Sequence, residues 1–294
     1  MKKITPLQKG DSIYVISSAG PVKDAESLFR AVDYIKSKGF NVILGKHIFA
    51  QDGYLAGSDE LRLEDLHSAF KSDAKAILCA RGGYGTARLL DKIDYDLISQ
   101  NPKVFLGHSD ITALLNNLPC PCFHSPMAVG DFGGEIDAIT QKNFFEVIQG
   151  VTAPYLYAAK SDFQTINEGA VTASLCGGNL SVLVSLLGTR YFPDYSEKIL
   201  LLEDLNEEPY KLDRMLTQLR LAGVFDKVCG VVFAGFGDIQ VSVDFLRSFL
   251  PESVPAIYGF FAAHDKSKYT LPFGVRYNFD ANCGTLELLD NIWE

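Results

Sequence analysis

The segment VFLGHSDITALL, which spans Val104–Leu115, carries the pattern that decides the fold. Its first four residues are apolar or glycine, without the alternation of a half-exposed strand, which is typical of a strand buried on both faces. A turn, GHSD at Gly107–Asp110, follows, and the residues from Ile111 onward have the character of a helix. A buried strand, a sharp turn and a helix predict one unit of an α/β domain.

The same unit recurs through the first half of the chain. Short apolar runs at Ser12–Ser17, Asn41–Gly45 and Ala76–Ala80 predict further buried strands. Between them, Asp24–Lys38 has apolar residues at helical spacing, and Ser58 is expected to cap a second helix. Repeated strand–helix units predict a parallel sheet with helices on both sides.

The alternation of predicted strands and helices stops between residues 151 and 168. The sequence there is polar and turn-like, so we predict a linker. Beyond it, apolar runs predict strands at Ala170–Cys176, Lys198–Glu203, Val228–Ala234, Ala256–Tyr258 and Thr285–Leu289. Helices are expected at Asn179–Gly188, Pro209–Ala222 and Val243–Phe249. We therefore predict an α/β protein with an N-terminal doubly wound, flavodoxin-like parallel sheet domain (residues 1–150) and a C-terminal α/β domain with a mixed sheet (residues 169–294).

The composition of the 294 residues limits the possible partners. Lys and Arg number 27 against 36 Asp and Glu, a formal net charge of −9, and no basic run offsets it. An acidic chain repels phosphate backbones, so we expect no nucleic-acid partner. No apolar stretch approaches the roughly 18 residues of a membrane span, and the N-terminal residues lack the apolar core of a signal peptide. We expect a cytoplasmic protein with no membrane partner.

The sequence gives little support for a metal or a redox cofactor. Its six cysteines are too few and too scattered for a disulfide framework, and Cys79, Cys176 and Cys229 lie in apolar runs, where a thiol behaves as a small hydrophobe. The pair Cys120 and Cys122 lacks the partner cysteines of a metal site. No HExxH or DxDxDG pattern is present, so we expect neither a metal nor a cofactor.

The GHSD turn has two interpretations. A sharp turn after a buried strand is the setting of a nucleophile elbow, in which the Ser109 oxygen is exposed and the next backbone N–H is free to bind an oxyanion. Ile111 stands where the G-x-S-x-G pattern has its second glycine. Alternatively, Ser109 or Asp110 caps the helix that follows. The tetrapeptide by itself leaves both interpretations open.

The glycine-rich segment RGGYG, Arg81–Gly85, has three interpretations. Its glycines permit positive φ angles and the close approach of a ligand. It could cradle a phosphate at a helix N-terminus, although it matches neither G-x-G-x-x-G nor a Walker loop. It could supply an oxyanion donor that faces Ser109, because neighbouring parallel strands end at the same edge of a sheet. It could also be no more than a tight turn.

Four acids lie near the end of one predicted strand. Glu203 is the last residue of that strand, so the sheet would fix the direction of its carboxylate, which could orient a histidine. Asp204 is expected to point the opposite way. Glu207 and Glu208 precede Pro209, a preferred first residue of a helix. We therefore expect these three acids to be surface or capping residues.

Five histidines could serve as a base. His47 and His67 are expected to be solvated, and His124 ends a strand where it could line a pocket. His108 adjoins the candidate nucleophile but should point to the opposite face of an extended strand. His264 lies in the loop FFAAHDKSKYTLPFG. A loop histidine is more often structural than catalytic, so the histidines by themselves do not identify the base.

Taken together, these motifs resemble one family over nearly the whole chain: the LD-carboxypeptidases, serine peptidases of murein recycling that include the microcin-immunity type enzymes. The motifs are RGGYGTARLL (Arg81–Leu90), GHSDIT (Gly107–Thr112), CGGNLSVLVSLLGT (Cys176–Thr189), LLEDLNEEPYKLDRMLTQL (Leu201–Leu219) and TLPFG (Thr270–Gly274). Such a set in this order is highly specific.

The resemblance implies a metal-independent serine carboxypeptidase with Ser109 as nucleophile and Glu203 and His264 completing a triad. It implies that the backbone N–H groups of Gly83 and Asp110 form the oxyanion hole. The implied substrate is a muropeptide, from whose tetrapeptide the terminal D-alanine is released, with an aminoacyl-adenylate conjugate as the alternative. Family members are commonly dimers, so a homodimer is expected. With the serine in the first domain and the other two residues in the second, the site is expected at the domain interface.

Two positions depart from the family pattern, and two rival classes share parts of it. Ala263 stands where the family usually has glycine, which we expect to shift the following loop slightly, and Ser125 replaces a glycine before Pro-Met, which could reshape a pocket wall. A nucleotide- or flavin-binding protein lacks its fingerprint glycines here. An α/β-hydrolase esterase shares the order Ser, Glu, His but requires a glycine at position 111.

Overall fold

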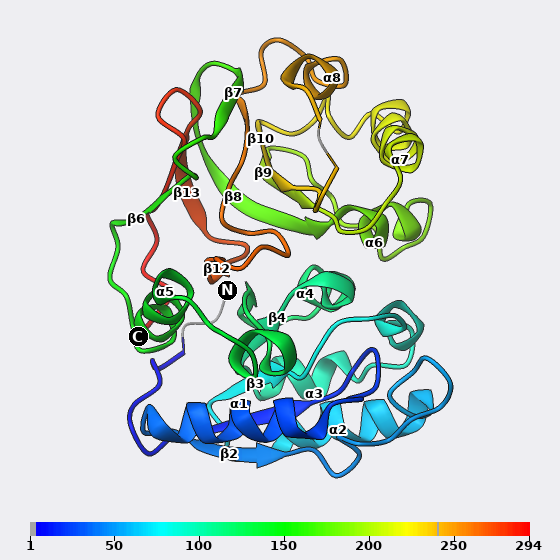
Figure 1. Ribbon diagram of the computed structural model, residues 1–294, viewed down its shortest axis with the longest axis vertical. Helices are drawn as coiled ribbons and strands as arrows, with labels where there is room; N and C mark the ends of the chain where they lie inside the picture. The colour runs from blue at the N-terminus through cyan, green and yellow to red at the C-terminus, as the bar shows by residue number, and fades with distance from the viewer. Residues whose placement is uncertain (1–3, 240) are drawn as a thin grey trace. The chain divides into compact units, whose positions relative to one another are not determined.

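The chain is an α/β protein with two sheets, as predicted from the sequence (Figure 1). The structure is a computed structural model that describes residues 4–239 and 241–294. Contacts divide it into two compact units. The first comprises the chain up to Val151 together with Tyr269–Pro272 and Ile292–Glu294, and the second comprises Thr152–Lys268 and Phe273–Asn291. The segments Tyr269–Pro272 and Ile292–Glu294 thus belong to the first unit, although most of the chain after Val151 belongs to the second.

The sheet of the first unit has a doubly wound topology. Five parallel strands have the order 2-1-3-4-5, which is that of flavodoxin-like folds. The strands are β2 (Asn41–Leu44), β1 (Ser12–Ile16), β3 (Ala76–Cys79), β4 (Val104–Gly107) and β5 (Cys122–His124). A two-residue strand, β12 (Leu271–Pro272), pairs antiparallel with β5. Every residue of β3 and β4 is buried, so helices cover both faces, as their apolar runs predicted.

Two of the longer helices of the first unit begin at side-chain caps. The Asp24 carboxylate accepts from the Ser27 N–H, and the Ser58 hydroxyl accepts from the Leu61 N–H. The longer helices are α1 (Ala25–Ser37), α2 (Asp59–Lys71) and α5 (Ala138–Ile148). Shorter helical segments are η1 (Thr86–Leu89), α3 (Tyr95–Gln100), η2 (Ser109–Ile111), α4 (Thr112–Leu115) and η3 (Ala128–Phe132).

The sheet of the second unit is mixed. Four central strands, β8 to β11, are parallel to one another, and antiparallel strands flank them on both sides. The order across the sheet is β6 (Tyr155–Ala158), β14 (Thr285–Leu288), β13 (Arg276–Asp280), β8 (Ala170–Asn179), β9 (Lys198–Glu203), β10 (Gly230–Gly235), β11 (Ala256–Tyr258) and β7 (Gln164–Asn167).

The stretch predicted as a linker contains the two edge strands of this sheet, β6 and β7. Sequence analysis also missed β13. In β6 and β13 buried residues alternate with more exposed ones, so neither strand shows the continuous apolar run that marked the central strands. The stretch from 151 to 168 is therefore part of the second sheet, and the limits of the two domains stay a prediction.

Three helices pack on the second sheet through a single apolar core (Figure 1). They are α6 (Leu180–Leu186), α7 (Pro209–Leu221) and α8 (Val243–Arg247). Their buried leucines meet apolar side chains of β9 and β10, including Leu200, Leu202 and Phe233. This packing fixes the directions of β9 and β10 and therefore the position of Glu203, at the end of β9.

Gly177 in β8 and Gly188 after α6 predict a sharp difference between two alanine substitutions. A Cβ on Gly177 would lie 2.1 Å from the carbonyl oxygen of buried Leu201 in β9. Gly188 also has a positive φ, but a Cβ there meets nothing within 4 Å. We expect Gly177→Ala to lower the free energy of unfolding by more than about 3 kcal/mol and Gly188→Ala by only about 1 kcal/mol. Urea unfolding checks both, and similar values would contradict the strand contact.

Candidate functional site

Ser109 has the backbone of a nucleophile elbow. It follows β4 with φ 61°, in the left-handed region that residues other than glycine rarely adopt. Such strain is common at functional turns. A Cβ on Gly107 would lie 2.9 Å from Ile111, so the glycine before the turn makes room for the isoleucine. The isoleucine in place of the second glycine is thus compatible with this sharp turn.

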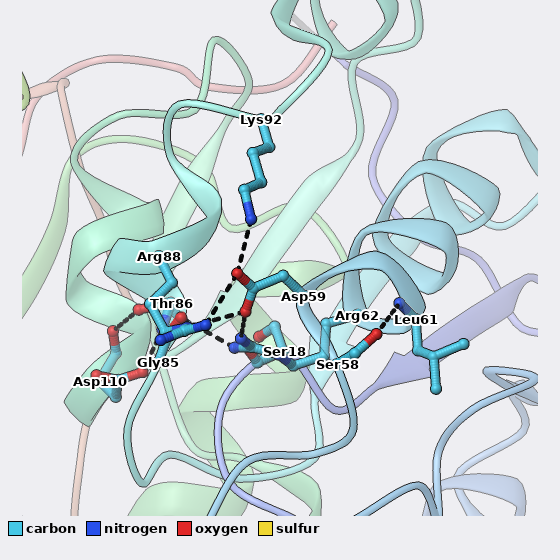
Figure 2. Close-up of polar contacts among 10 residues, drawn as sticks. All are labelled: Ser18, Ser58, Asp59, Leu61, Arg62, Gly85, Thr86, Arg88, Lys92 and Asp110. Carbon is cyan, nitrogen blue, oxygen red and sulfur yellow. Dashed lines mark hydrogen bonds and ion pairs between the residues drawn. The ribbon is translucent and has the colours of Figure 1, made fainter. Parts of the chain in front are cut away.

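The interpretation of Ser109 or Asp110 as a cap of the following helix is wrong. No side-chain cap is present at η2 or α4. The buried Asp110 carboxylate instead accepts from the Thr86 N–H at 2.9 Å, and the Thr86 hydroxyl donates to the Asp110 carbonyl (Figure 2). Burial raises the pKa of Asp110. The two hydrogen bonds between Asp110 and Thr86 therefore connect the turn at Ser109 to the end of the glycine-rich loop after β3.

The loop after β3 lies directly against Ser109. A Cβ on Gly82 would be 2.8 Å from both Cβ and Oγ of Ser109, so only glycine leaves the serine its space. Gly83 has a φ of 125°, which favours glycine. In the described part of the chain, neither the Gly83 nor the Asp110 N–H donates a hydrogen bond. The arrangement suits an oxyanion hole better than a tight turn that serves only as a connection.

The phosphate-cradle interpretation of the same loop is disfavoured by charge. η1 begins at Thr86, and its first N–H already binds the Asp110 carboxylate. A second anion at this short helix would face that carboxyl group. Among the described residues, no group of three or more His, Cys, Asp and Glu side chains is arranged to hold a metal ion.

His264 and Glu203 form a hydrogen-bonded pair in the second unit. Nδ1 of His264 lies 2.7 Å from Oε2 of Glu203, and the glutamate side chain is fully buried. Oε1 of Glu203 has no hydrogen-bond partner among residues 4–239 and 241–294, and such a buried polar atom is uncommon outside functional sites. Burial acts to lower the pKa of His264, but the hydrogen bond and the charge of Glu203 outweigh it, so the pKa is raised.

The other acids differ from one another. Asp204 was expected to be a surface or capping residue. It is buried, so the surface alternative is wrong, and it helps to cap α6. Its carboxylate accepts from the Ser181 N–H at 2.8 Å and from Asn179 Nδ2 at 3.1 Å. Since β8 runs beside β9 and α6 starts at its end, the helix N-terminus covers Asp204. Glu208 is exposed and Glu207 is half-buried.

The remaining histidines have structural contacts. His47 and His67 are half-buried rather than solvated: Nε2 of His47 lies 2.9 Å from Glu64, and Nε2 of His67 accepts from a backbone N–H. His108 and His124 are buried in the first unit with ring centroids 5.8 Å apart. The ring of His47 thus contacts an exposed glutamate, and the ring of His67 contacts a backbone N–H.

Four of the six cysteines are buried and are therefore poor candidates for the nucleophile, whereas Cys283 is exposed. Burial raises the pKa of the Cys79 and Cys176 thiols to about 12. Cys120 and Cys122 are also buried, with sulfur atoms 3.8 Å apart, whereas Cys229 is half-buried. A buried thiol with a raised pKa is inert at neutral pH.

The two departures from the family pattern are accommodated locally. Ala263 is buried, and its methyl group faces Gly235, where a Cβ would lie 3.2 Å away. Ser125 is fully buried, its N–H donates to the Gly107 carbonyl at 3.0 Å, and its hydroxyl donates to the Pro126 carbonyl. Each substitution therefore packs within its own unit.

The predicted site residues thus form two groups. Ser109, Gly83 and Asp110 belong to the first unit, whereas Glu203 and His264 belong to the second. Sequence analysis missed residues that support them: Gly82, Thr86, Asn179 and the buried role of Asp204. All four residues lie within the quoted motifs, but their partners are distant in sequence.

A strained serine after a parallel strand, and a buried glutamate bound to a histidine, are typical of hydrolases that use nucleophilic catalysis. Comparison with protein-family models identifies the class. The model for the LD-carboxypeptidase N-terminal domain matches residues 13–122, and the model for the C-terminal domain matches residues 172–279. The chain belongs to the LD-carboxypeptidase family and is therefore a hydrolase of the peptidase class.

Individual relatives cover nearly the full chain. A probable murein peptide carboxypeptidase of Bacillus subtilis is 37% identical over 288 residues, covering 92% of this chain and 89% of that protein. The solved muramoyltetrapeptide carboxypeptidase of Oxalobacter formigenes is 32% identical, with a TM-score of 0.82 over 95% of this chain and 99% of that one. The apo structure of the microcin C7 self-immunity protein MccF is 25% identical, with a TM-score of 0.90 and complete coverage of both chains. No helix in the described residues is long and apolar enough to span a membrane.

The Glu203–His264 pair predicts a specific titration. In the wild type, the imidazole should titrate above its ordinary value of 6.5, because Glu203 stabilises the cation. In Glu203→Gln that charge is lost while the burial stays, so the pKa should fall below the wild-type value. Histidine NMR over a pH series measures both, with Glu207→Gln as the control that leaves it unchanged. A wild-type midpoint at or below 6.5 would contradict the pairing.

Proposed function

We propose that the protein is a serine carboxypeptidase that releases the terminal D-alanine from the murein tetrapeptide, using Ser109, Glu203 and His264. The observation that carries the proposal is the 2.7 Å hydrogen bond between His264 and buried Glu203, since it fixes a base of the kind that serine hydrolases require. The left-handed backbone of Ser109 supports the assignment of the nucleophile.

Acylation assigns one role to each group. Nε2 of His264 removes the proton of Ser109 as the serine oxygen attacks the scissile carbonyl. Glu203 holds the imidazole through Nδ1 and stabilises the imidazolium that forms. The Gly83 and Asp110 N–H groups bind the developing oxyanion, each typically worth roughly 3 kcal/mol in such sites.

Release of the products reverses these proton transfers. The imidazolium of His264 gives its proton to the departing amine of D-alanine, which leaves an ester on Ser109. Water, activated by the neutral imidazole, then attacks the ester, and the oxyanion hole serves a second time. The shortened peptide leaves with a new carboxylate, and the serine recovers its proton.

The substrate assignment follows from the relatives. The Bacillus and Oxalobacter proteins are named for murein peptide and muramoyltetrapeptide. Murein peptides are recycled in the cytoplasm, so we place this protein there and expect neither a nucleic-acid nor a membrane partner.

The oligomeric state and the domain boundary also remain proposals. A homodimer is proposed on the family resemblance. We also propose a domain boundary near residue 150, with the nucleophile in the N-terminal domain and the acid and base in the C-terminal one.

A second candidate substrate is an aminoacyl-adenylate conjugate. The observation that favours it is the likeness to the microcin C7 self-immunity protein, at a TM-score of 0.90. The higher identities to carboxypeptidases, 37% and 32%, favour the murein peptide. Both substrates require the same acyl-transfer chemistry, so only the products distinguish them.

The products of muropeptide digestion test the function. We expect D-alanine from a tetrapeptide, none from the DD bond of a pentapeptide, and a loss of about four or more orders of magnitude in Ser109→Ala, as for other triad deletions. Mass spectrometry of the products and far-UV circular dichroism of the variant give the readouts. Wild-type activity in a folded Ser109→Ala would refute the nucleophile, and cleavage of an aminoacyl-adenylate conjugate alone would favour the second candidate.

Amide substitutions of the acids test the assignment of Glu203. Glu203→Gln removes the charge that stabilises the imidazolium, so kcat should fall by about two to four orders of magnitude. Glu207→Gln and Glu208→Gln, at half-buried and exposed positions, should stay within about twofold of wild type. Steady-state kinetics on the tetrapeptide measure all three. A large loss at Glu207 or Glu208, with Glu203→Gln active, would place the site one turn later.

A further inference from the structure

A buried arginine joins the loops that follow β1 and β3 in the first unit (Figure 2). Arg62, in α2, is 1% exposed, and its Nη1 donates to the carbonyl oxygens of Ser18 and Gly85 at 2.9 Å each. Ser18 follows β1, and Gly85 follows β3. One guanidinium nitrogen therefore connects two loops at the carboxyl edge of the sheet.

The same two loops touch at the peptide between Gly82 and Gly83. The Gly20 N–H donates to the Gly82 carbonyl at 3.1 Å. Because the N–H and C=O groups of a trans peptide point in opposite directions, this bond turns the Gly83 N–H away from Gly20. The direction of the proposed oxyanion donor therefore depends on where the loop with Ser18 and Gly20 is held.

Asp59 holds the guanidinium of Arg62. Its carboxylate accepts from Arg62 Nη2, and also from Arg88 and Lys92 at 2.9 and 2.8 Å (Figure 2). The hydrogen bond from Arg88, assisted by those from Lys92 and Arg62, keeps the pKa of Asp59 well below its usual range despite the burial. Asp59 is thus charged at neutral pH and compensates the buried cation.

The second proposed donor is tied to the same loop. Asp110 binds Thr86, the residue after Gly85, through both its carboxylate and its carbonyl oxygen. Arg62 fixes the Gly85 carbonyl, so the loop is held on one side by the arginine and on the other by the aspartate. An apolar side chain could fill the volume of Arg62 without the cost of burying a charge, but it could not donate to these carbonyls.

We propose that Arg62 is a positioning residue for the oxyanion hole: by holding the carbonyls of Ser18 and Gly85, it orients the Gly83 N–H toward the oxyanion that forms on attack by Ser109. The inference rests on the proposed function, since it takes Ser109 as the nucleophile. Arg62 acts through the backbone and stabilises the transition state only by way of Gly83.

Arg62→Lys and Arg88→Gln form the matched pair for the test. Lysine keeps the charge, but its single nitrogen cannot reproduce the fork that serves Asp59 and two carbonyls. The Arg88 side chain binds the same Asp59 and is 48% exposed, whereas the Gly85 carbonyl accepts only from the Arg88 backbone N–H, which the substitution keeps. The full-length proteins are compared in D-alanine release, in the rate of Ser109 labelling by a fluorophosphonate probe, and in unfolding midpoint.

For Arg62→Lys we expect kcat to fall about ten- to a hundredfold, KM to stay within about threefold, and the labelling rate to fall by a similar factor to kcat, because an oxyanion donor acts in the transition state. Arg88→Gln should stay within about twofold in kcat, KM and labelling rate. A folded Arg62→Lys with wild-type kcat and labelling would overturn the proposal, and so would a loss confined to KM.

Asp59→Asn keeps the test decisive if Arg62→Lys does not fold. It leaves the guanidinium and its carbonyl acceptors but removes the counter-charge, so kcat should fall about three- to tenfold at constant KM, and a wild-type kcat would overturn the proposal. Failure of the proposed function is distinguishable, because the wild type would then release no D-alanine. If the wild type is still labelled at Ser109, the labelling rates decide the inference; if it is neither active nor labelled, both proposals are overturned.

Discussion

Parallel strands end at a common edge of their sheet, and both groups of candidate residues in this protein follow from that constraint. In the first unit, the turns after β1, β3 and β4 meet there, so Gly20 bonds to Gly82 and Gly82 lies against Ser109. In the second unit, β9 ends at Glu203, beside the end of β8. The antiparallel strands lie outside these central strands and contribute no candidate residue. The strand order of each sheet thus determines which turns lie side by side, and the turns carry most of the candidate residues.

Buried charge at these edges is costly, and each charged group is compensated in a way that also fixes the backbone. Arg62 is neutralised by Asp59 while it donates to two carbonyls. Asp204 accepts from the start of α6, and Asp110 accepts from the start of η1. Glu203 is bonded to His264 and keeps a second oxygen without a partner in the described chain. Since an uncompensated buried charge would cost several kcal/mol, these contacts hold the turns rigidly.

Comparison of the predictions with the structure shows where local patterns are informative. The central strands and most helices lie within a few residues of their predicted limits, because a strand buried on both faces and a capped amphipathic helix are marked by their own residues. The edge strands β6 and β7 and the inner strand β13 were missed because they lack a continuous apolar run. Of the two interpretations left open for the GHSD turn, the helix cap is wrong, and the partner of Asp110, Thr86, lies 24 residues away at another helix.

The sequence by itself determined the buried strand–turn–helix units, the α/β class and the motifs by which the chain belongs to its family. Each of these is encoded in a few neighbouring residues. Only the tertiary structure decided that Arg62 bonds to the carbonyls of two loops, and only it gave the geometry of the Glu203–His264 pair, 61 residues apart, which the family resemblance had implied. The physical reason is that such hydrogen bonds join segments whose proximity comes from strand order and helix packing, which no local pattern records.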